Sequence, residues 1–455
     1  MADALVVRDL QVHFYTRRGV YKALNGATMR LAKGEVLGVA GESGCGKSTL
    51  GLTVMSLLPR NAAIPRGQVI LGNQDLVNLQ TAYAASAGEN FRPKRNEKVL
   101  KRVNKAMALL RGKRLSMVFQ EPMTSLNPVL QVGFQIAETI YFHDPALLAR
   151  RALARSKATT KDMKDLLAIL HERGADEKAV TDFARARGLQ GIEEQALFVW
   201  RRTDIQVSRR ETAILALCNE HIRPLAKKTY ERVASVGKIP IELRMTPGVS
   251  RIVRRFLFRE GYLKAAELLT SLGIPHAERV VRMFPHELSG GMRQRVVIAI
   301  SLANNPEIVI MDEPTSAVDV TVQAQILELV KQIRTSVSAS FLVISHDLSV
   351  LAEVSDRIAI MYAGRVVETG PMNRVLENPL HPYTQLLISA IPTLEGSQVA
   401  GIKGEIPDMR APPSGCSFHP RCPFAFDKCK TDVPTDLPQE DGRLVACWLY
   451  EAKKP

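Results

Sequence analysis

The chain has 455 residues, of which 46% are hydrophobic, 24% are charged and 5% are aromatic. This composition is typical of a globular protein that buries its own core, and the length suggests two or three domains. No run of about 18 apolar residues occurs, so the sequence predicts no membrane-spanning helix. The N-terminus lacks the basic and then apolar pattern of a secretion signal.

The formal net charge is +15, and the basic excess lies in two segments, 81–115 and 141–270. The simplest interpretation of both segments is solvated helix faces and loops. The functional alternatives are contact with anionic lipid headgroups, with an acidic partner or with nucleic acid, and we expect no nucleic acid partner.

The first 80 residues predict short β-strands at 5–7 and 10–14. A longer apolar strand at 35–40 ends at a glycine cluster, and residues 48–58 have the apolar spacing of a helix that stops before Pro59. The pattern is therefore strand, glycine loop and helix.

The middle of the chain has a different pattern. Residues 81–115 indicate a mobile polar loop leading into a basic helix, and residues 145–270 indicate several amphipathic helices that form an inserted subdomain. After residue 285 helices alternate with short buried strands, which is typical of an α/β fold with a mostly parallel sheet. The expected helices and strands are 291–302, 308–311, 321–333 and 341–344.

The segment after the first long strand matches the phosphate-loop pattern G-x-x-x-x-G-K-[ST]. Its glycines let backbone amides turn toward phosphate oxygens, and the following helix adds its N-terminal partial charge. Lys47 is expected to lie between the β- and γ-phosphates, and Ser48 to ligate Mg²⁺. The residues expected to hold the nucleotide here are Gly41, Glu42, Ser43, Gly44, Cys45, Gly46, Lys47, Ser48 and Thr49.

The apolar strand at 308–311 leads into two adjacent carboxylates. Asp312 is placed to hold Mg²⁺, and Glu313 to polarise a water for attack on the γ-phosphate. A second glycine turn, at Ser289, Gly290 and Gly291, precedes another helix and forms a second anion cradle. Since one γ-phosphate does not need two cradles, we expect the second one to serve the nucleotide of another subunit.

The chain resembles the ATP-binding cassette (ABC) superfamily over residues 5–80, 115–140 and 265–395. Four motifs, which follow one another in the order typical of that family, carry the resemblance. Residues 41–48 resemble the Walker A loop, 288–292 the family signature and 308–313 the Walker B strand. Ser345, His346 and Asp347 resemble the switch region. Two departures are Val318, where the family more often has leucine, and Met292, where many members carry glutamine.

The resemblance implies roles for further residues. Gln120 resembles the glutamine loop, which ligates Mg²⁺ and senses the membrane subunit, while His346 contacts the γ-phosphate. Phe14 matches the aromatic that stacks on adenine, although a core position is the alternative. Asp319 belongs to a loop that crosses the dimer interface. The implied catalytic residues are Glu313, His346 and Gln120, with ATP and Mg²⁺ as ligands.

Several segments resemble one branch, the oligopeptide/dipeptide importer ATPases: residues 284–295, 319–327, 378–387 and 416–423. That branch implies a second ABC ATPase subunit, identical or different, two permeases and an extracytoplasmic solute-binding protein. It also implies a peripheral position on the cytoplasmic face of the membrane. Peptides, oligosaccharides, glutathione or nickel are the possible cargoes. The motifs are also compatible with a soluble ABC ATPase that acts on nucleic acid, and the chain could instead be a non-catalytic subunit.

Four of the six cysteines lie near the C-terminus, at Cys416, Cys422, Cys429 and Cys447. Four thiolates this close along the chain suit zinc or an iron–sulfur cluster. The resemblance to the peptide-importer branch favours [4Fe–4S], with zinc and no metal as alternatives.

The predicted organisation is therefore an ABC ATPase domain of the P-loop NTPase class over residues 1–395, with a mostly parallel sheet and an antiparallel β subdomain. A basic insertion at 81–115 and a helical insertion at 145–270 enlarge its helical subdomain. A small cysteine-rich module follows at 396–455.

Overall fold

The computed structural model describes residues 2–72, 74–75, 96–120, 125–174, 176–189, 192–201, 206–215, 224–239, 247–316, 320–336, 339–390 and 404–451. The chain divides into two compact units. One contains Met1–Glu121 and Asn305–Pro455, and the other contains Pro122–Asn304. Within the described ranges, every helix is too short or too polar to cross a lipid bilayer.

The first unit contains a four-stranded antiparallel sheet in the order β2-β1-β4-β5. The two short strands expected near the N-terminus are one continuous strand. The chain passes the polar Arg8-Asp9 step through a register shift between Val7 and Leu10, with Asp9 at a φ of 44°. A β-bulge of this kind bends a strand without ending it. The strands are β1 (Asp3–Thr16), β2 (Gly19–Ala32), β4 (Ala62–Leu71) and β5 (Gln74–Asp75).

The larger sheet of this unit has the order β11-β12-β10-β9-β3-β8-β7-β6. The neighbouring pairs β9–β3, β3–β8, β8–β7 and β7–β6 are parallel. The pairs β9–β10, β10–β12 and β11–β12 are antiparallel. The predicted combination of a mostly parallel sheet and an antiparallel β subdomain is confirmed. The strands are β3 (Val36–Ala40), β6 (Leu115–Val118), β7 (Ile308–Asp312), β8 (Ser340–Ile344), β9 (Arg357–Tyr362), β10 (Arg365–Pro371), β11 (Leu437–Pro438) and β12 (Leu444–Val445).

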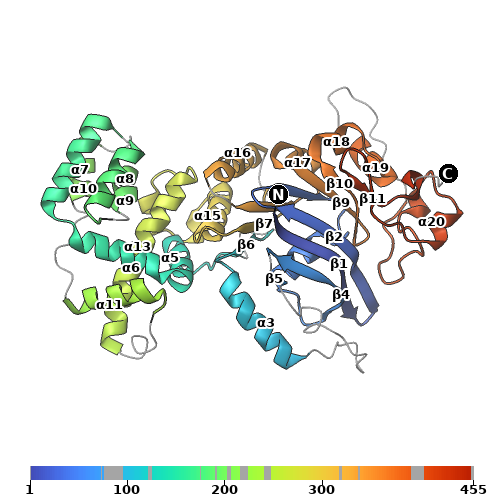
Figure 1. Ribbon diagram of the computed structural model, residues 1–455, viewed down its shortest axis with the longest axis horizontal. Helices are drawn as coiled ribbons and strands as arrows, with labels where there is room; N and C mark the ends of the chain where they lie inside the picture. The colour runs from blue at the N-terminus through green and yellow to red at the C-terminus, as the bar shows by residue number, and fades with distance from the viewer. Residues whose placement is uncertain are drawn as a thin grey trace. The chain divides into compact units, whose positions relative to one another are not determined.

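Helices α16 to α19 lie along one side of the larger sheet (Figure 1). The helix after the glycine cluster, α1, ends at Val54 and not at Leu58, because Ser56 adopts a left-handed conformation at a φ of 52°. The helices of this unit are α1 (Lys47–Val54), α3 (Glu97–Leu110), α16 (Val320–Ser336), α17 (Leu348–Val354), α18 (Met372–Glu377), α19 (Pro382–Ser389) and α20 (Asp427–Thr431), with 3₁₀ turns η2 (His419–Arg421) and η3 (Trp448–Tyr450).

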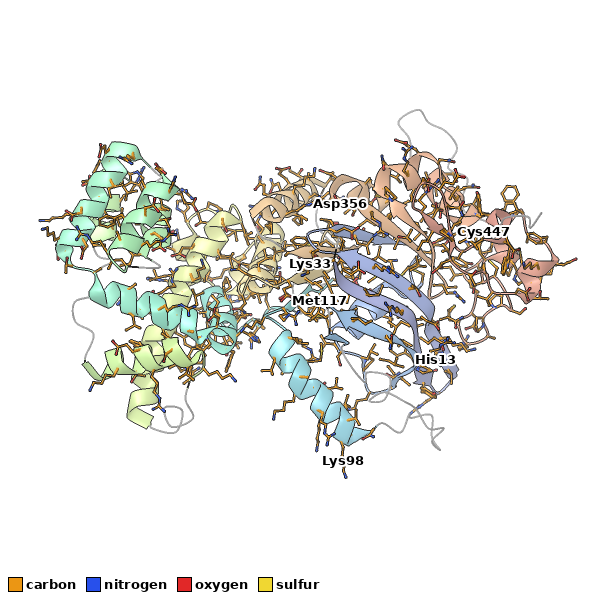
Figure 2. All side chains as sticks on the ribbon, in the orientation of Figure 1. His13, Lys33, Lys98, Met117, Asp356 and Cys447 are labelled. Carbon is orange, nitrogen blue, oxygen red and sulfur yellow. The ribbon has the colours of Figure 1, made fainter. Side chains whose placement is uncertain are left out.

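The basic helix expected within 81–115 is α3. Its Val103 and Met107 are buried in the core of the first unit, and Lys98 and Lys101 are exposed on the opposite side. Figure 2 labels Lys98 on this helix. The predicted mobile loop before α3 falls on residues 76–95, outside the described part of the chain.

The second unit is helical, as expected for 145–270, and it also contains α5 and α15. Side chains of Asp144, Thr159 and Asp176 accept hydrogen bonds from the first-turn amides of α6, α7 and α8, so these N-caps set where the helices begin. The helices are α5 (Val132–His143), α6 (Pro145–Lys157), α7 (Thr160–Arg173), α8 (Glu177–Ala186), α9 (Ile192–Trp200), α10 (Val207–Leu215), α11 (Pro224–Val236), α13 (Pro247–Ser271), α14 (Ala277–Val280) and α15 (Gly290–Leu302), with the 3₁₀ turn η1 (Pro285–Glu287).

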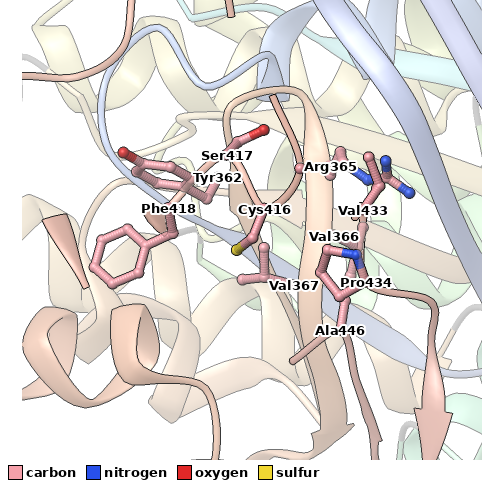
Figure 3. A pocket seen from close by; sticks show the side chains of 11 residues that line it. Tyr362, Arg365, Val366, Val367, Cys416, Ser417, Phe418, Val433, Pro434 and Ala446 are labelled. Carbon is pink, nitrogen blue, oxygen red and sulfur yellow. The ribbon is translucent and has the colours of Figure 1, made fainter. Parts of the chain in front are cut away.

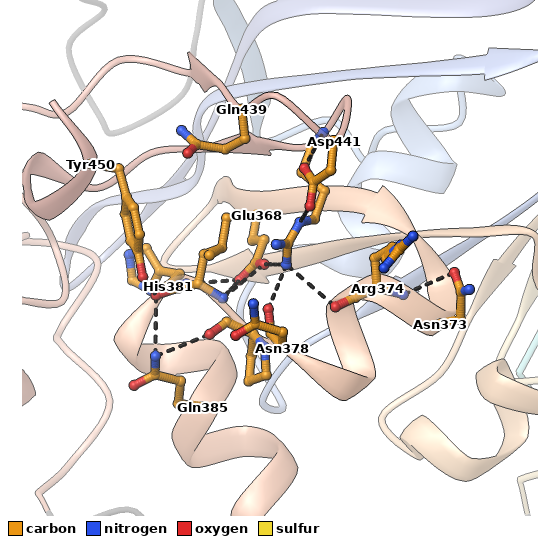
Figure 4. Close-up of polar contacts among 12 residues, drawn as sticks. Glu368, Asn373, Arg374, Asn378, His381, Gln385, Gln439, Asp441 and Tyr450 are labelled. Carbon is orange, nitrogen blue, oxygen red and sulfur yellow. Dashed lines mark hydrogen bonds and ion pairs between the residues drawn. The ribbon is translucent and has the colours of Figure 1, made fainter. Parts of the chain in front are cut away.

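The C-terminal residues 404–451 belong to the first unit, where β12 pairs with β10. Arg443 lies 3.5 Å from the buried carboxylate of Glu368 and donates to the carbonyl of Asn378, and Glu368 accepts the amide of His381 at 2.9 Å (Figure 4). The expectation of a separate cysteine-rich module is therefore not confirmed, and the boundary at 395/396 stays a prediction.

His381 gives this network a pH dependence. Its side chain is buried, its Nδ1 accepts the Tyr383 amide at 3.0 Å, and burial lowers its pKa from 6.5 to about 3. The unfolded chain therefore binds more protons than the folded chain between pH 6.5 and about 3. The contribution of His381 to the free energy of unfolding is therefore fully present above pH 6.5, and it is lost as the pH falls from 6.5 to about 3.

We predict that His381→Asn, which keeps an acceptor for the Tyr383 amide but does not titrate, removes this pH dependence. Between pH 7 and pH 5 the wild type should lose about 2 kcal/mol more unfolding free energy than the variant. Urea unfolding of both proteins at the two pH values measures the difference. An equal loss in both proteins would contradict a buried neutral histidine.

Candidate functional site

The glycine loop between β3 and α1 has a backbone that only glycine accepts at two positions. Gly41 has a φ of 152°, and a Cβ there would lie 2.2 Å from the carbonyl oxygen of Met361. Gly46 has a φ of 105°, and a Cβ there would lie 2.5 Å from the carbonyl oxygen of Ala23. The loop is therefore clamped against neighbouring backbone, and side chains at these positions would displace it.

Lys47 begins α1, and its side chain turns back over the loop. Its Nζ donates to the carbonyl oxygen of Gly41 at 2.6 Å and to that of Glu42 at 3.1 Å, and the residue is only 5% exposed. The ammonium group and the N-terminus of α1 place positive charge in one loop, as an anion site requires.

Ser48, in the first turn of α1, contacts Asp312, the last residue of β7. The Ser48 hydroxyl donates to Oδ1 of Asp312 at 3.0 Å, and burial raises the pKa of Asp312, while the Ser48 hydrogen bond opposes that rise. A hydroxyl beside a buried carboxylate forms the oxygen-rich pair that Mg²⁺ prefers, so these two residues fit the ion that the fold implies.

Glu313 is the centre of a second polar cluster. One of its carboxylate oxygens accepts the Gln120 amide at 2.8 Å, and the other lies 3.1 Å from Nδ1 of His346. Glu313 has a φ of 48°, a left-handed conformation that is rare for non-glycine residues and is concentrated at functional sites. The three predicted catalytic side chains thus lie together, each just after the end of a parallel strand.

The predicted signature residues belong to the second unit. Ser289 is the N-cap of α15, and its side chain accepts the Met292 amide at 3.4 Å. Ser289 and Gly290 are exposed, and a Cβ on Gly290 would meet no atom within 4 Å. Asp319 lies outside the described residues.

The adenine-stacking role expected for Phe14 stays a prediction. Phe14 lies on β1, is partly buried and packs against the core of the first unit. Its strand partner Tyr21 makes the direct contact with the phosphate loop, because the Tyr21 hydroxyl donates to the Gly44 carbonyl at 3.3 Å.

Sequence reasoning missed three residues that contact Glu42 or support its contacts. Arg421 forms an ion pair with Glu42 at 2.8 Å, Tyr383 accepts the Glu42 amide at 2.9 Å, and Tyr362 packs beside both. No motif marks them, because a lone arginine before Cys422 and two core tyrosines have no characteristic spacing.

The four C-terminal cysteines line one small pocket with Phe418 and the buried His381. Burial raises the pKa of the Cys447 thiol to about 11. A neighbouring apolar pocket is lined by Cys416, Val367 and Pro434 (Figure 3). Within the described residues, no group of three or more His, Cys, Asp or Glu is arranged to hold a metal ion. The residues as placed do not fit a cluster, so the [4Fe–4S] prediction is not supported.

We predict that Gly41→Ala destabilises the chain more than Gly44→Ala. Gly44 has a φ of 82° but open space around a new Cβ, so alanine there adds only the backbone strain of about 1–2 kcal/mol. At Gly41 a clash with the Met361 carbonyl is added. Urea unfolding of the two variants measures the difference, and equal losses would show that the loop is not held against β9.

Two family models match this chain. The family model described as ABC transporter matches residues 24–316, more than half of the chain. The model described as oligopeptide/dipeptide transporter, C-terminal region, matches residues 367–429.

Two Bacillus subtilis (strain 168) proteins are similar over almost their whole length. The oligopeptide transport ATP-binding protein AppD is 32% identical over 99% of this chain and 98% of that protein. The dipeptide transport ATP-binding protein DppD is 30% identical over 100% of this chain and 96% of that protein. A dimeric post-hydrolysis structure of the ATP-binding cassette MJ0796 bound to ADP and Pi covers 81% of this chain and 98% of that chain. It is 16% identical with a TM-score of 0.42, a likeness too low to carry an argument.

Proposed function

Because the chain belongs to the ABC transporter family, in its oligopeptide/dipeptide branch, we propose that it is the ATP-hydrolysing subunit that drives peptide import. The observation that supports this most is the pair of polar clusters at the strand ends. Ser48 with Asp312 and Glu313 with Gln120 and His346 lie beside a glycine loop that holds Lys47.

The loop and its lysine bind the phosphates of ATP. Lys47 neutralises negative charge on the β- and γ-phosphates, and the amides at the start of α1 donate to their oxygens. Ser48, Asp312 and Gln120 would hold Mg²⁺, which supplies charge neutralisation when bound.

Glu313 acts as the general base for the attacking water. Gln120 and His346 each contact one oxygen of its carboxylate and so fix the direction in which it accepts a proton. A base held in this way favours the in-line geometry that phosphoryl transfer requires. His346, whose side chain is 62% exposed, would contact the γ-phosphate.

The Ser289–Gly291 turn serves the nucleotide of a companion ABC ATPase subunit, identical or different. Ser289 and Gly290 are exposed, and the space where a Gly290 side chain would lie is open. The turn can therefore accept a ligand from outside the chain. ATP then joins two subunits, and hydrolysis releases them.

The proposed transporter assembly at a membrane rests on membership of the oligopeptide/dipeptide branch. Two permeases, contacted near residues 121–135, and an extracytoplasmic solute-binding protein complete the transporter, and the chain lies at the cytoplasmic face. Peptides are the favoured cargo because the similar Bacillus proteins are named for oligopeptide and dipeptide transport. Oligosaccharides and nickel are less favoured, and so is action on nucleic acid.

We predict that Glu313→Gln leaves ATP binding intact and lowers ATP turnover about 100-fold or more, because the amide cannot take the proton from water. Phosphate release by the purified complex measures turnover, and a fluorescent ATP analogue measures binding. Glu353→Gln, at a surface ion pair with Lys331, is the matched control. Normal turnover by Glu313→Gln would refute the role of Glu313.

Lys47→Ala should weaken ATP binding about tenfold or more, since it removes the ammonium group from the loop. Isothermal titration with Mg-ATP measures the affinity. Lys331→Ala, which removes a surface ammonium, should bind ATP as the wild type does. Equal affinity in the two variants would place the phosphates elsewhere.

A further inference from the structure

We propose that Arg421 is a positioning residue for the phosphate loop, acting through its ion pair with Glu42. The proposal rests on the proposed ATP hydrolysis, because it assigns to the C-terminal region a part in shaping that site. Both residues lie in the first compact unit, so the contact is internal to it.

The contact is a two-point ion pair in a largely enclosed place. Nη1 of Arg421 donates to Oε2 of Glu42 at 2.8 Å, and Nη2 donates to Oε1 at 3.0 Å. The side chain of Arg421 is 5% exposed and that of Glu42 is 20% exposed. Parallel hydrogen bonds of this kind fix the carboxylate in orientation as well as in position.

Glu42 is held at its backbone as well as at its side chain. Its amide donates to the Tyr383 hydroxyl at 2.9 Å, and its carbonyl accepts Lys47 Nζ at 3.1 Å. Arg421 therefore acts on the residue whose carbonyl also holds the phosphate-binding lysine. A shift of Glu42 would move the resting position of that ammonium group.

Arg421 is itself kept in place by aromatic packing. Its guanidinium lies 5.7 Å from the centroid of Tyr362 and 6.0 Å from that of Phe418, and Nη1 also donates to the Tyr362 hydroxyl at 3.3 Å. The rings of Tyr362, Phe418 and Tyr383 lie within 4.6–5.5 Å of one another. The side chain is thus ordered before any ligand arrives, so loop positioning needs no further loss of side-chain freedom.

The charge of Glu42 makes this pairing necessary for the proposed function. An unpaired carboxylate in a loop that receives a triphosphate would repel it, and the enclosed position would weaken screening by water. Arg421 cancels that charge. The arginine side chain therefore contributes electrostatics and geometry to ATP binding without touching ATP.

The test compares Arg421→Gln, Glu42→Gln, the double variant and Lys430→Gln in the full chain with its companion subunits. Lys430 forms an exposed pair with Asp427 in the same C-terminal region, so its variant removes a positive charge away from the loop. We expect Arg421→Gln to raise KM for ATP about tenfold or more with a smaller change in kcat. Lys430→Gln should match the wild type.

The double variant distinguishes the effect of the unpaired Glu42 carboxylate from general damage to the structure around Arg421. Because it has no unpaired carboxylate, it should recover a large part of the ATP affinity that Arg421→Gln loses. If the losses of ATP affinity in the two single variants add up in the double variant, with no recovery, the proposal would be overturned. An unchanged KM in Arg421→Gln, with a wild type that hydrolyses ATP, would also overturn it.

A second readout needs no nucleotide, so it stands even if the proposed function fails. Cys45 lies in the loop at 2% exposure, and Cys429 is buried in the C-terminal region at 8%. We expect Arg421→Gln to speed alkylation of Cys45 several-fold, measured by mass spectrometry, with Cys429 unchanged. An unchanged Cys45 rate, or equal rises at both cysteines, would contradict loop positioning by Arg421.

Discussion

Parallel pairing of β3, β8, β7 and β6 is the constraint on which the candidate site depends. The carboxyl ends of parallel strands meet at one edge of a sheet, and each important residue follows such an end. Gly41 follows β3, Glu313 follows β7, His346 follows β8 and Gln120 follows β6. The hydrogen bonds of Ser48 to Asp312 and of Glu313 to Gln120 and His346 are the consequence.

The sequence predicted most of this edge because its signals are local. Fully buried parallel strands are unbroken apolar runs in the sequence, so β7 and β8 were located to within a residue, and the glycine spacing marked the loop. The end of α1 was missed because apolar Leu57 and Leu58 continue the helical spacing, whereas Ser56 turns left-handed. Arg111, more than 50 positions away, donates to the carbonyl oxygens of Met55 and Ser56 at 2.8 Å each, and no local pattern in the sequence marks this contact.

The contacts of the C-terminal region with the phosphate loop could not be predicted from the sequence. Glu42 and Arg421 are 379 positions apart, and neither residue type nor spacing marks their pairing. The four C-terminal cysteines suit zinc or an iron–sulfur cluster, and only the resemblance to the peptide-importer branch favours the cluster. Their spacing does not determine how the four sulfur atoms are arranged. In the second unit, the basic excess is partly paired, as in Arg187 with Asp162 and Arg201 with Glu177, which favours a structural explanation for that charge.

The position of bound nucleotide tests the central claim most directly. A structure of the chain and its companion subunit with Mg²⁺ and a non-hydrolysable ATP analogue should place the γ-phosphate within hydrogen-bond reach of Lys47. The Mg²⁺ should lie between that phosphate and the Ser48–Asp312 pair. Nucleotide bound away from this strand edge, or no bound nucleotide at saturating concentration, would contradict the account.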